Sequence, residues 1–201
     1  MSNILRGGFR PRRPGMYGIR RYEVVSNNST AVFPGDFVTL TTAGVVQPST
    51  AGDTALLLGA VAAVTYVNST NRRVYGSYIP ANTTYTPTTR YSKNASYAWV
   101  WDDPNIEYIA TVASNAATDT LAEIAAAIGS NMDLVATAGD TVYGRSGYTL
   151  DGNPIAGTAQ FRILEVLRDP ANDLRSSSQS NWKVVCMVNE GFHSFYSGAG
   201  I

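Results

Sequence analysis

Residues 55–67 read ALLLGAVAAVTYV, a long apolar run that a single glycine, Gly59, interrupts. Alanine, valine and leucine dominate it, and no charged residue falls inside it. A run of this length with β-branched residues and an internal glycine indicates one or two buried strands, bent at Gly59. We therefore expect a fold built around buried β structure.

Shorter segments of the same kind lie on both sides of this run. They are bounded by turn residues such as Pro34-Gly35 and Ala43-Gly44, and several alternate between apolar and polar residues. This pattern predicts further strands, which we place at residues 22–26, 36–41, 45–46, 73–79, 95–101, 105–112, 160–167 and 182–189. The predicted fold class is mainly β, a small β-barrel or sandwich.

One short helix is expected near residue 120. Thr120 and Glu123 have the spacing of a capping box, and Gly129 supplies a C-terminal stop. Four apolar residues repeat at helical spacing on one face, which we expect to pack on a sheet: Leu121, Ile124, Ala125 and Ile128.

The composition describes a neutral surface. The chain has 201 residues, a length that favours one domain or one domain with a small appendage. Charged residues make up 15%, below the roughly 25% usual for soluble domains. The remaining polar residues are mostly Thr, Ser, Asn, Gly and Tyr, which suit strands, turns and wet interfaces. A shell protein that binds copies of itself, a lectin-like domain and an adhesin all fit.

The chain offers little support for a disulfide or a membrane span. Cys186 is its single cysteine, so no intramolecular disulfide can form. No apolar stretch reaches the roughly 18 residues that a membrane-spanning helix needs, and no apolar segment of a signal peptide follows the N-terminal arginines. We expect no membrane association.

Residues 1–21 differ from the rest of the chain. Glycines and prolines interrupt them, no acid precedes Glu23, and six arginines occur: Arg6, Arg10, Arg12, Arg13, Arg20 and Arg21. We expect an extended basic N-terminal arm that becomes ordered only on another surface, followed by one β-rich domain over 22–201. That domain can divide into subregions 22–92 and 93–201. Because the net charge is zero, the domain is acidic, and the arm of one copy can lie on a neighbour.

Arginine forks suit phosphates as well as carboxylates and carbonyl groups. A dedicated nucleic-acid binder usually has a basic body too, whereas this chain has an isoelectric point of about 6.6 and only two lysines, Lys93 and Lys183. We therefore favour a protein partner for the arm over nucleic acid.

Catalytic and metal sites are weakly represented. His193 is the single histidine, and Cys186 lies inside an apolar strand where a core role is favoured over pairing with His193. A structural zinc site needs about four ligands, which one cysteine and one histidine do not provide. We expect no catalytic residue, no cofactor and no metal.

Three further motifs have two interpretations each. Asp102, Asp103 and Glu107 can hold calcium or form an acid/base pair, but a charged turn around Pro104 is favoured. The segment Gly144-Arg145-Ser146-Gly147 can cradle an anion, but it lacks the lysine and the following helix of a phosphate-binding loop, so we favour a β-turn. Trp99 and Trp101 share one face of a strand, either a stacking platform or, as we favour, a core face.

The order of the motifs carries a resemblance. Residues 34–40, Gly44-Val45-Val46 and Leu58-Gly59-Ala60-Val61-Ala62 come first, and Asp102-Asp103-Pro104-Asn105-Ile106-Glu107-Tyr108 precedes the expected helix. Residues 129–135, 144–147 and Leu150-Asp151 follow, and residues 162–166, Asp169-Pro170, Asn172 and residues 184–189 close the series. Over residues 30–192 this order resembles capsid cement, or head decoration, proteins of tailed bacteriophages.

The resemblance implies a structural virion protein that is not an enzyme. Such a protein is assembled in the bacterial cytoplasm, binds the outer surface of a capsid and stabilises contacts between major capsid protein subunits. The arginines of the arm and the tyrosines of the loops, Tyr75, Tyr78, Tyr85 and Tyr91, are then the expected contacts. We expect a homo-oligomer, a trimer before a dimer. The rivals are a carbohydrate-binding or host-adhesion domain of a head fibre and, less favoured, a hydrolase.

We also expect from the sequence that removing residues 1–21 leaves a folded body that no longer binds shells.

Overall fold

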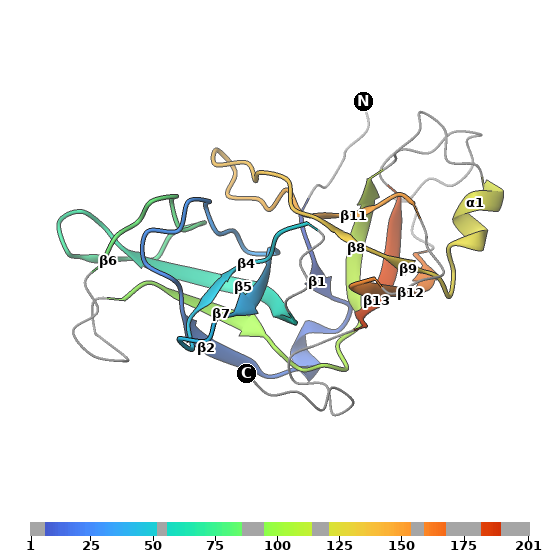
Figure 1. Cartoon of the computed structure of the whole chain (residues 1–201), viewed down its shortest axis with the longest axis horizontal. Coiled ribbons are helices and arrows are strands. Elements are labelled where there is room, and N and C mark those ends of the chain that lie inside the picture. The colour runs from blue at the N-terminus through green and yellow to red at the C-terminus, as the bar shows by residue number, and fades with distance from the viewer. Residues whose placement is uncertain are drawn as a thin grey trace.

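The computed structural model describes residues 7–51, 56–85, 95–113, 121–153, 159–167 and 182–189. Two β-sheets lie next to each other along the long axis of the molecule, and a short helix lies at the outer end of the second sheet (Figure 1). The prediction of a mainly β fold of the barrel or sandwich kind with one short α-helix is confirmed.

The first sheet is built from the N-terminal half of the chain. Its strand order is β2-β7-β5-β3-β4, and β6 pairs with β5 at one end. All the pairings along this path are antiparallel. The strands are β2 (Ile19–Glu23), β3 (Phe37–Leu40), β4 (Val46–Pro48), β5 (Leu57–Val67), β6 (Arg73–Val74) and β7 (Tyr97–Trp101).

The second sheet is built mainly from the C-terminal half. Its order is β10-β11-β8-β13-β12-β9, with β1 from the N-terminal segment paired to β8. The pairing of β11 with β8 is parallel, and the others are antiparallel. The strands are β1 (Arg10–Pro11), β8 (Tyr108–Ala113), β9 (Asn131–Met132), β10 (Leu134–Val135), β11 (Thr149–Asp151), β12 (Phe161–Val166) and β13 (Lys183–Val188).

The apolar run at residues 55–67 forms one continuous strand, β5, from Leu57 onward. Its ladder with β3 is irregular beside Gly59, and its ladder with β7 is irregular between Val61 and Ala63. Leu57 and Ala60 belong to the main core, which the two sheets share. A second core under the first sheet takes other residues of the same strand, namely Leu58, Val61 and Val64. Burial on both faces explains why the run lacks the alternation of a half-exposed strand.

Gly59 is required by the close approach of β5 to β7. A Cβ atom at this position would lie 1.9 Å from the carbonyl oxygen of Trp101. Because that atom belongs to backbone paired in the sheet, the two strands have to separate to admit a methyl group. We expect Gly59→Ala to lower the free energy of unfolding by about 3 kcal/mol or more. Urea unfolding measures this change. Gly15→Ala is the control, since nothing lies within 4 Å of its added Cβ, and an equal loss in both variants would contradict the clash.

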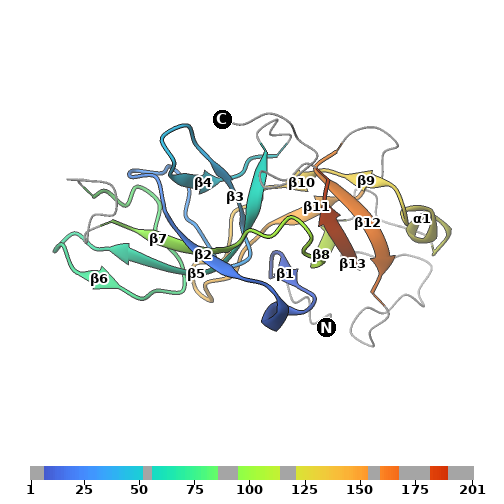
Figure 2. The same ribbon diagram turned by 90° about the horizontal axis from the view of Figure 1, so that it is seen from below.

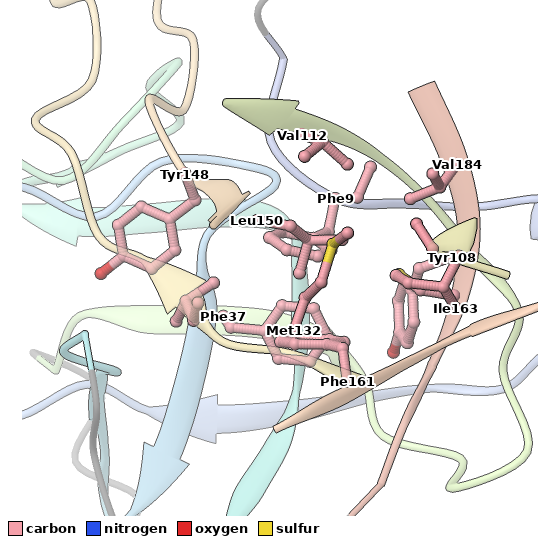
Figure 3. Packing of buried hydrophobic residues seen from close by; sticks show 14 of the residues in the cluster. Phe9, Phe37, Tyr108, Val112, Met132, Tyr148, Leu150, Phe161, Ile163 and Val184 are labelled. Atoms are coloured by element: carbon pink, nitrogen blue, oxygen red, sulfur yellow. The ribbon is translucent and has the colours of Figure 1, made fainter. Parts of the chain in front are cut away.

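Aromatic rings fill the centre of the main core (Figure 3). The Phe9 ring stacks on Phe161 with centroids 4.9 Å apart, and it meets Phe37 edge to face at 4.8 Å. Tyr108 contacts Phe37 at 5.0 Å, and its hydroxyl donates a hydrogen bond to the carbonyl oxygen of Trp101 at 2.9 Å. Phe9 directly precedes β1, and the other rings come from β3, β8 and β12, so the core joins both sheets.

The N-terminal segment departs from the expectation of an arm that orders only on another surface. Phe9 is 1% exposed, and its amide donates to the carbonyl oxygen of Gly35 at 2.9 Å. The chain then pairs with β8 through Arg10–Pro11 and with β7 through Ile19–Glu23. Residues 7–21 therefore run over the body of their own chain (Figure 2). Burial of Phe9, which lies among the arginines, holds this segment in the core, and the charge pattern of the sequence did not indicate it.

The helix is shorter than expected. α1 spans Leu121–Ala126, and Gly129 follows with φ +84°, its amide donating to the carbonyl oxygen of Ile163. Ile124 and Ala127 are buried, whereas Ala125 and Ile128 are exposed, so the packed face differs from the predicted one. Because the chain leaves the helix after Ala126, Ile128 turns away from the sheet. Thr120 lies outside the described residues, as do the side chains of Leu121 and Glu123.

Most strand predictions are confirmed, with shifted ends. β2 begins three residues before the predicted segment because its ladder with β7 starts at Ile19. The segment predicted at 73–79 forms a strand only at Arg73–Val74, and Ile79 makes an isolated bridge to Val32. β7 belongs to the first sheet, so that sheet continues beyond residue 92.

Candidate interaction surface

Two arginines expected to contact a partner form ion pairs inside their own chain. Arg12 lies 3.4 Å from Glu107 and 3.1 Å from Glu165, and Arg20 lies 2.9 Å from Asp102. Asp102 is buried, and its charge raises the pKa of Arg20. The positive charges of Arg12 and Arg20 are therefore paired with acidic residues of the same molecule.

The other arginines have varied surroundings. The Arg21 guanidinium lies 4.6 Å from the centroid of the Tyr97 ring, a cation–π contact that Arg73 shares at 5.4 Å. Arg10 is exposed and lines a small hollow with Arg145 and Lys183, and Arg13 is exposed. Arg6 lies outside the described residues. The described arginines thus have different partners: acids for Arg12 and Arg20, an aromatic ring for Arg21 and the margin of a hollow for Arg10.

The four tyrosines predicted as contacts also differ in their surroundings. Tyr75 is 81% exposed. Tyr78 is half-buried and stacks on Phe33 with ring centroids 5.0 Å apart, so it supports the fold. Tyr85 donates its hydroxyl to Glu23 and to the carbonyl oxygen of Val24, and Tyr91 lies outside the described residues. Of the three described tyrosines among these four, Tyr75 is the one whose side chain is largely exposed.

Two largely exposed apolar side chains on the loop from Asp140 to Arg145, those of Val142 and Tyr143, were not predicted as contacts from the sequence. Val142 is 83% exposed and Tyr143 is 69% exposed. This loop follows β10 and leads towards β11 on the upper side of the molecule (Figure 1). Two apolar residues directly before the turn predicted at 144–147 are the sequence signal that points to them.

The Asp140–Arg145 loop is held by its own hydrogen bonds. The amide of Asp140 donates to the carbonyl oxygen of Arg145 at 2.7 Å, and the amide of Arg145 donates back at 3.0 Å. The Asp140 carboxylate accepts from the amides of Val142 at 2.8 Å and Tyr143 at 3.3 Å. Gly144 adopts φ +63°, which closes the turn. Val142 and Tyr143 are thus presented by an ordered backbone.

Side-chain contacts also position this loop. The Arg145 guanidinium lies 5.2 Å from the centroid of the Tyr143 ring. A Cβ atom on Gly144 would lie 2.3 Å from Cβ of Ser77, so the tip of the loop rests on the segment that carries Tyr75. We refer to Val142, Tyr143 and Tyr75 together as the apolar contact surface. Rigid aromatic side chains of this kind bind with a small entropic cost and often dominate interface energy.

Asp102, Asp103 and Glu107 lie around a turn, as favoured from the sequence, and each has its own partners. Asp102 accepts from Arg20 and from the Tyr22 hydroxyl, while Glu107 pairs with Arg12. Asp103 accepts from the amide of Asn105 at 2.8 Å. Among the described residues, no three His, Cys, Asp or Glu side chains lie close enough together to hold a metal ion.

The remaining predicted positions lie mostly in the core. Cys186 is fully buried in β13, as predicted, and burial raises the pKa of its thiol. Trp101 packs against the main core, which agrees with the favoured reading of a core face, and Trp99 is half-buried. The turn lies at residues 141–144 and so mostly precedes the one expected at 144–147, while Arg145 forms an isolated bridge with Asp140 and Ser146 follows in irregular structure. His193 lies outside the described residues.

None of the helices within the described ranges is long and apolar enough to cross a membrane. Comparison of the chain with models of protein families, with curated proteins and with solved structures finds no match.

Proposed function

We propose that this chain is a capsid cement protein of a tailed bacteriophage. It binds the outer surface of the capsid and stabilises contacts between major capsid protein subunits. The observation that carries the proposal is the apolar contact surface, where an ordered loop exposes Val142 and Tyr143 and packs against the segment that carries the exposed Tyr75. The order of motifs over residues 30–192, which resembles that of cement proteins, supports the choice of partner.

The physics of a shell suits a small contact of this kind. A cement protein joins subunits that are repeated many times, so each contact needs only modest affinity. An exposed tyrosine beside an exposed valine provides apolar area, and the neutral, hydroxyl-rich surface around them suits a wet rim. An oligomer, with a trimer before a dimer, would multiply the contacts of each unit.

Trp101 packs against the core and Trp99 is half-buried, so we rank a carbohydrate-binding head-fibre domain second. The cement role is therefore preferred over that rival.

Quantitative mass spectrometry of purified virions tests the proposed role directly. We expect the ratio of this chain to the major capsid protein to be near one or a simple fraction such as one third. A few copies per particle would indicate a fibre or portal component instead, and absence from virions would overturn the proposal.

Replacing both Val142 and Tyr143 by serine tests the apolar contact surface. We expect binding to shells that lack the protein to weaken by about tenfold or more, because buried aromatic anchors at interfaces contribute about 2 kcal/mol or more. Stability should change by less than about 0.5 kcal/mol, since both side chains are exposed. Co-sedimentation with shells measures the binding. Ile128→Ser, an exposed position beyond α1, is the control, and equal binding by the double variant would contradict the assignment.

A further inference from the structure

A cavity of about 530 Å³ lies where the first sheet meets the second. Its walls come from the segment before β3, from the end of β4 and from the segment that follows β10. Tyr148 closes one side, at the margin of the main core, with its hydroxyl directed away from the other labelled side chains (Figure 3). The volume falls within the range of small-molecule sites.

Two polar side chains in the wall have unused hydrogen-bonding capacity. Asp36 is 1% exposed, and its Oδ2 accepts from the amide of Phe33 at 2.8 Å. Its Oδ1 has no hydrogen-bond partner among the described residues, and neither has the buried Oγ of Ser49. The carbonyl oxygen of Ser49 accepts from the Tyr148 hydroxyl at 2.7 Å. A buried acceptor without a donor is costly, so a ligand that donates hydrogen bonds here would gain affinity.

The charge and the hydrocarbon surface narrow the class of ligand. Among the described lining residues Asp36 is the only acid, and none is a lysine, arginine or histidine. An ionised carboxylate in such a wall disfavours anions and favours a cation. Much of the wall is apolar, contributed by Ala31, Phe33, Pro48, Ala51, Ala136 and Ala138. An ammonium group on a short hydrocarbon stem satisfies both features.

We propose that this cavity binds a primary alkylammonium group, with Asp36 as its counter-ion and the Ser49 hydroxyl as a second acceptor. The group belongs either to a free amine or to a lysine side chain of a partner protein. None of the three residues of the apolar contact surface lines this cavity, although Thr141 of the same loop does, and occupation of the cavity does not depend on the capsid role.

The ionisation of Asp36 makes binding depend on pH. Burial raises the pKa of Asp36 to about 7, against the opposing effects of the Ser146 hydroxyl and the Phe33 amide. Tyr148 is the other titratable side chain among the described lining residues, and burial together with the Asp36 charge raises its pKa. Tyr148 therefore stays neutral over the range in which Asp36 titrates. Binding of a cation requires the ionised carboxylate and releases its proton.

Calorimetric titration of the full chain with pentylamine tests the proposal. We expect binding at about pH 8 and an affinity about tenfold or more lower at about pH 5.5, where little of the carboxylate is ionised. Pentan-1-ol, which has the same stem without the charge, should bind more weakly than pentylamine at pH 8. Equal binding of the alcohol and the amine, or an affinity independent of pH, would overturn the proposal.

Variants separate the site from nonspecific binding. Asp36→Asn should abolish pentylamine binding, and Ser49→Ala should weaken it several-fold while leaving Asp36 in place. Asp103→Asn, an exposed acid in the turn before β8, is the matched control and should bind as the parent does. Retained binding in both Asp36→Asn and Ser49→Ala would refute the assignment. Neither result bears on the shell binding of the Val142 and Tyr143 variant.

A lysine derivative identifies the source of the group. Nα-acetyl-lysine amide should bind at least as well as pentylamine if the natural occupant is a side chain, and should be excluded if it is a free amine. Binding of a neutral sugar such as methyl glucoside in place of either amine would overturn the choice of a cation.

Discussion

Replacing Phe9 by alanine is expected to lower the free energy of unfolding by about 3–5 kcal/mol, the usual cost of removing a fully buried phenylalanine ring. Phe9 lies in the middle of the main core and touches rings from both sheets, Phe37 from the first and Phe161 from the second (Figure 3). A cavity there cannot be closed by the movement of one strand. The loss is a large share of the total stability of about 5–15 kcal/mol typical of a domain.

Urea unfolding followed by tryptophan fluorescence measures this change. Met16→Ala is the control, because Met16 belongs to the same N-terminal segment but its side chain is exposed. By the same argument, deletion of residues 1–21 removes Phe9, β1 and most of β2, so we expect loss of the folded state in place of the folded, non-binding body that the sequence suggested. Equal stability of the Phe9 and Met16 variants would show that the N-terminal segment does not complete the core.

Among the elements that sequence patterns located best, β5 and β13 are mostly buried apolar runs, whereas β12 alternates between buried residues and the exposed Arg162 and Leu164. The structure places all three within two residues of their predicted ends. Short strands such as β9 and β10 were missed because two residues carry no periodicity. They form where Met132 and Leu134 become buried and pair with the neighbouring strands β12 and β11, which is a tertiary effect.

The candidate surface was harder to predict, for a different reason. The arginines before residue 22 stood out by charge, yet Arg12 and Arg20 are paired with acids more than 80 residues away in the sequence. No local pattern reports such pairs. Phe9, a single apolar residue among arginines and glycines, gave no periodic signal either. Conversely, Val142 and Tyr143 are apolar, and apolar residues are usually expected to be buried. Only the geometry of the loop shows that both are exposed.

The burial of Asp36 was also hidden, because the sequence placed this residue only at the start of the strand predicted over 36–41, after Pro34-Gly35. In the structure Asp36 is buried in the turn that leads into β3, and its carboxylate interacts with the Ser146 hydroxyl. Its acceptance of the Phe33 amide fixes the turn, so one acid stabilises a local fold while its second oxygen remains available to the cavity.

Asp36→Asn is expected to stabilise the protein at neutral and alkaline pH. Burial raises the pKa of Asp36 from 3.8 in the unfolded chain to about 7 in the folded protein. Between these two values the folded protein binds the proton more tightly than the unfolded chain does, so stability falls as the pH rises from about 4 to about 7. The full loss is on the order of 4 kcal/mol, from about 1.4 kcal/mol for each unit of pKa.

The asparagine amide can still accept from the Phe33 amide, but it has no charge to bury. The variant should therefore match the parent at about pH 2.5, where Asp36 is protonated in both states, and exceed it increasingly up to about pH 8, after which the difference stays constant. Denaturant unfolding of the two proteins across this range gives the difference directly, and the titration of all other groups cancels in it. Asp103→Asn should give a curve parallel to that of the parent. A stability difference that does not change with pH would mean that Asp36 is ionised in the folded protein throughout, held by a donor that balances its burial.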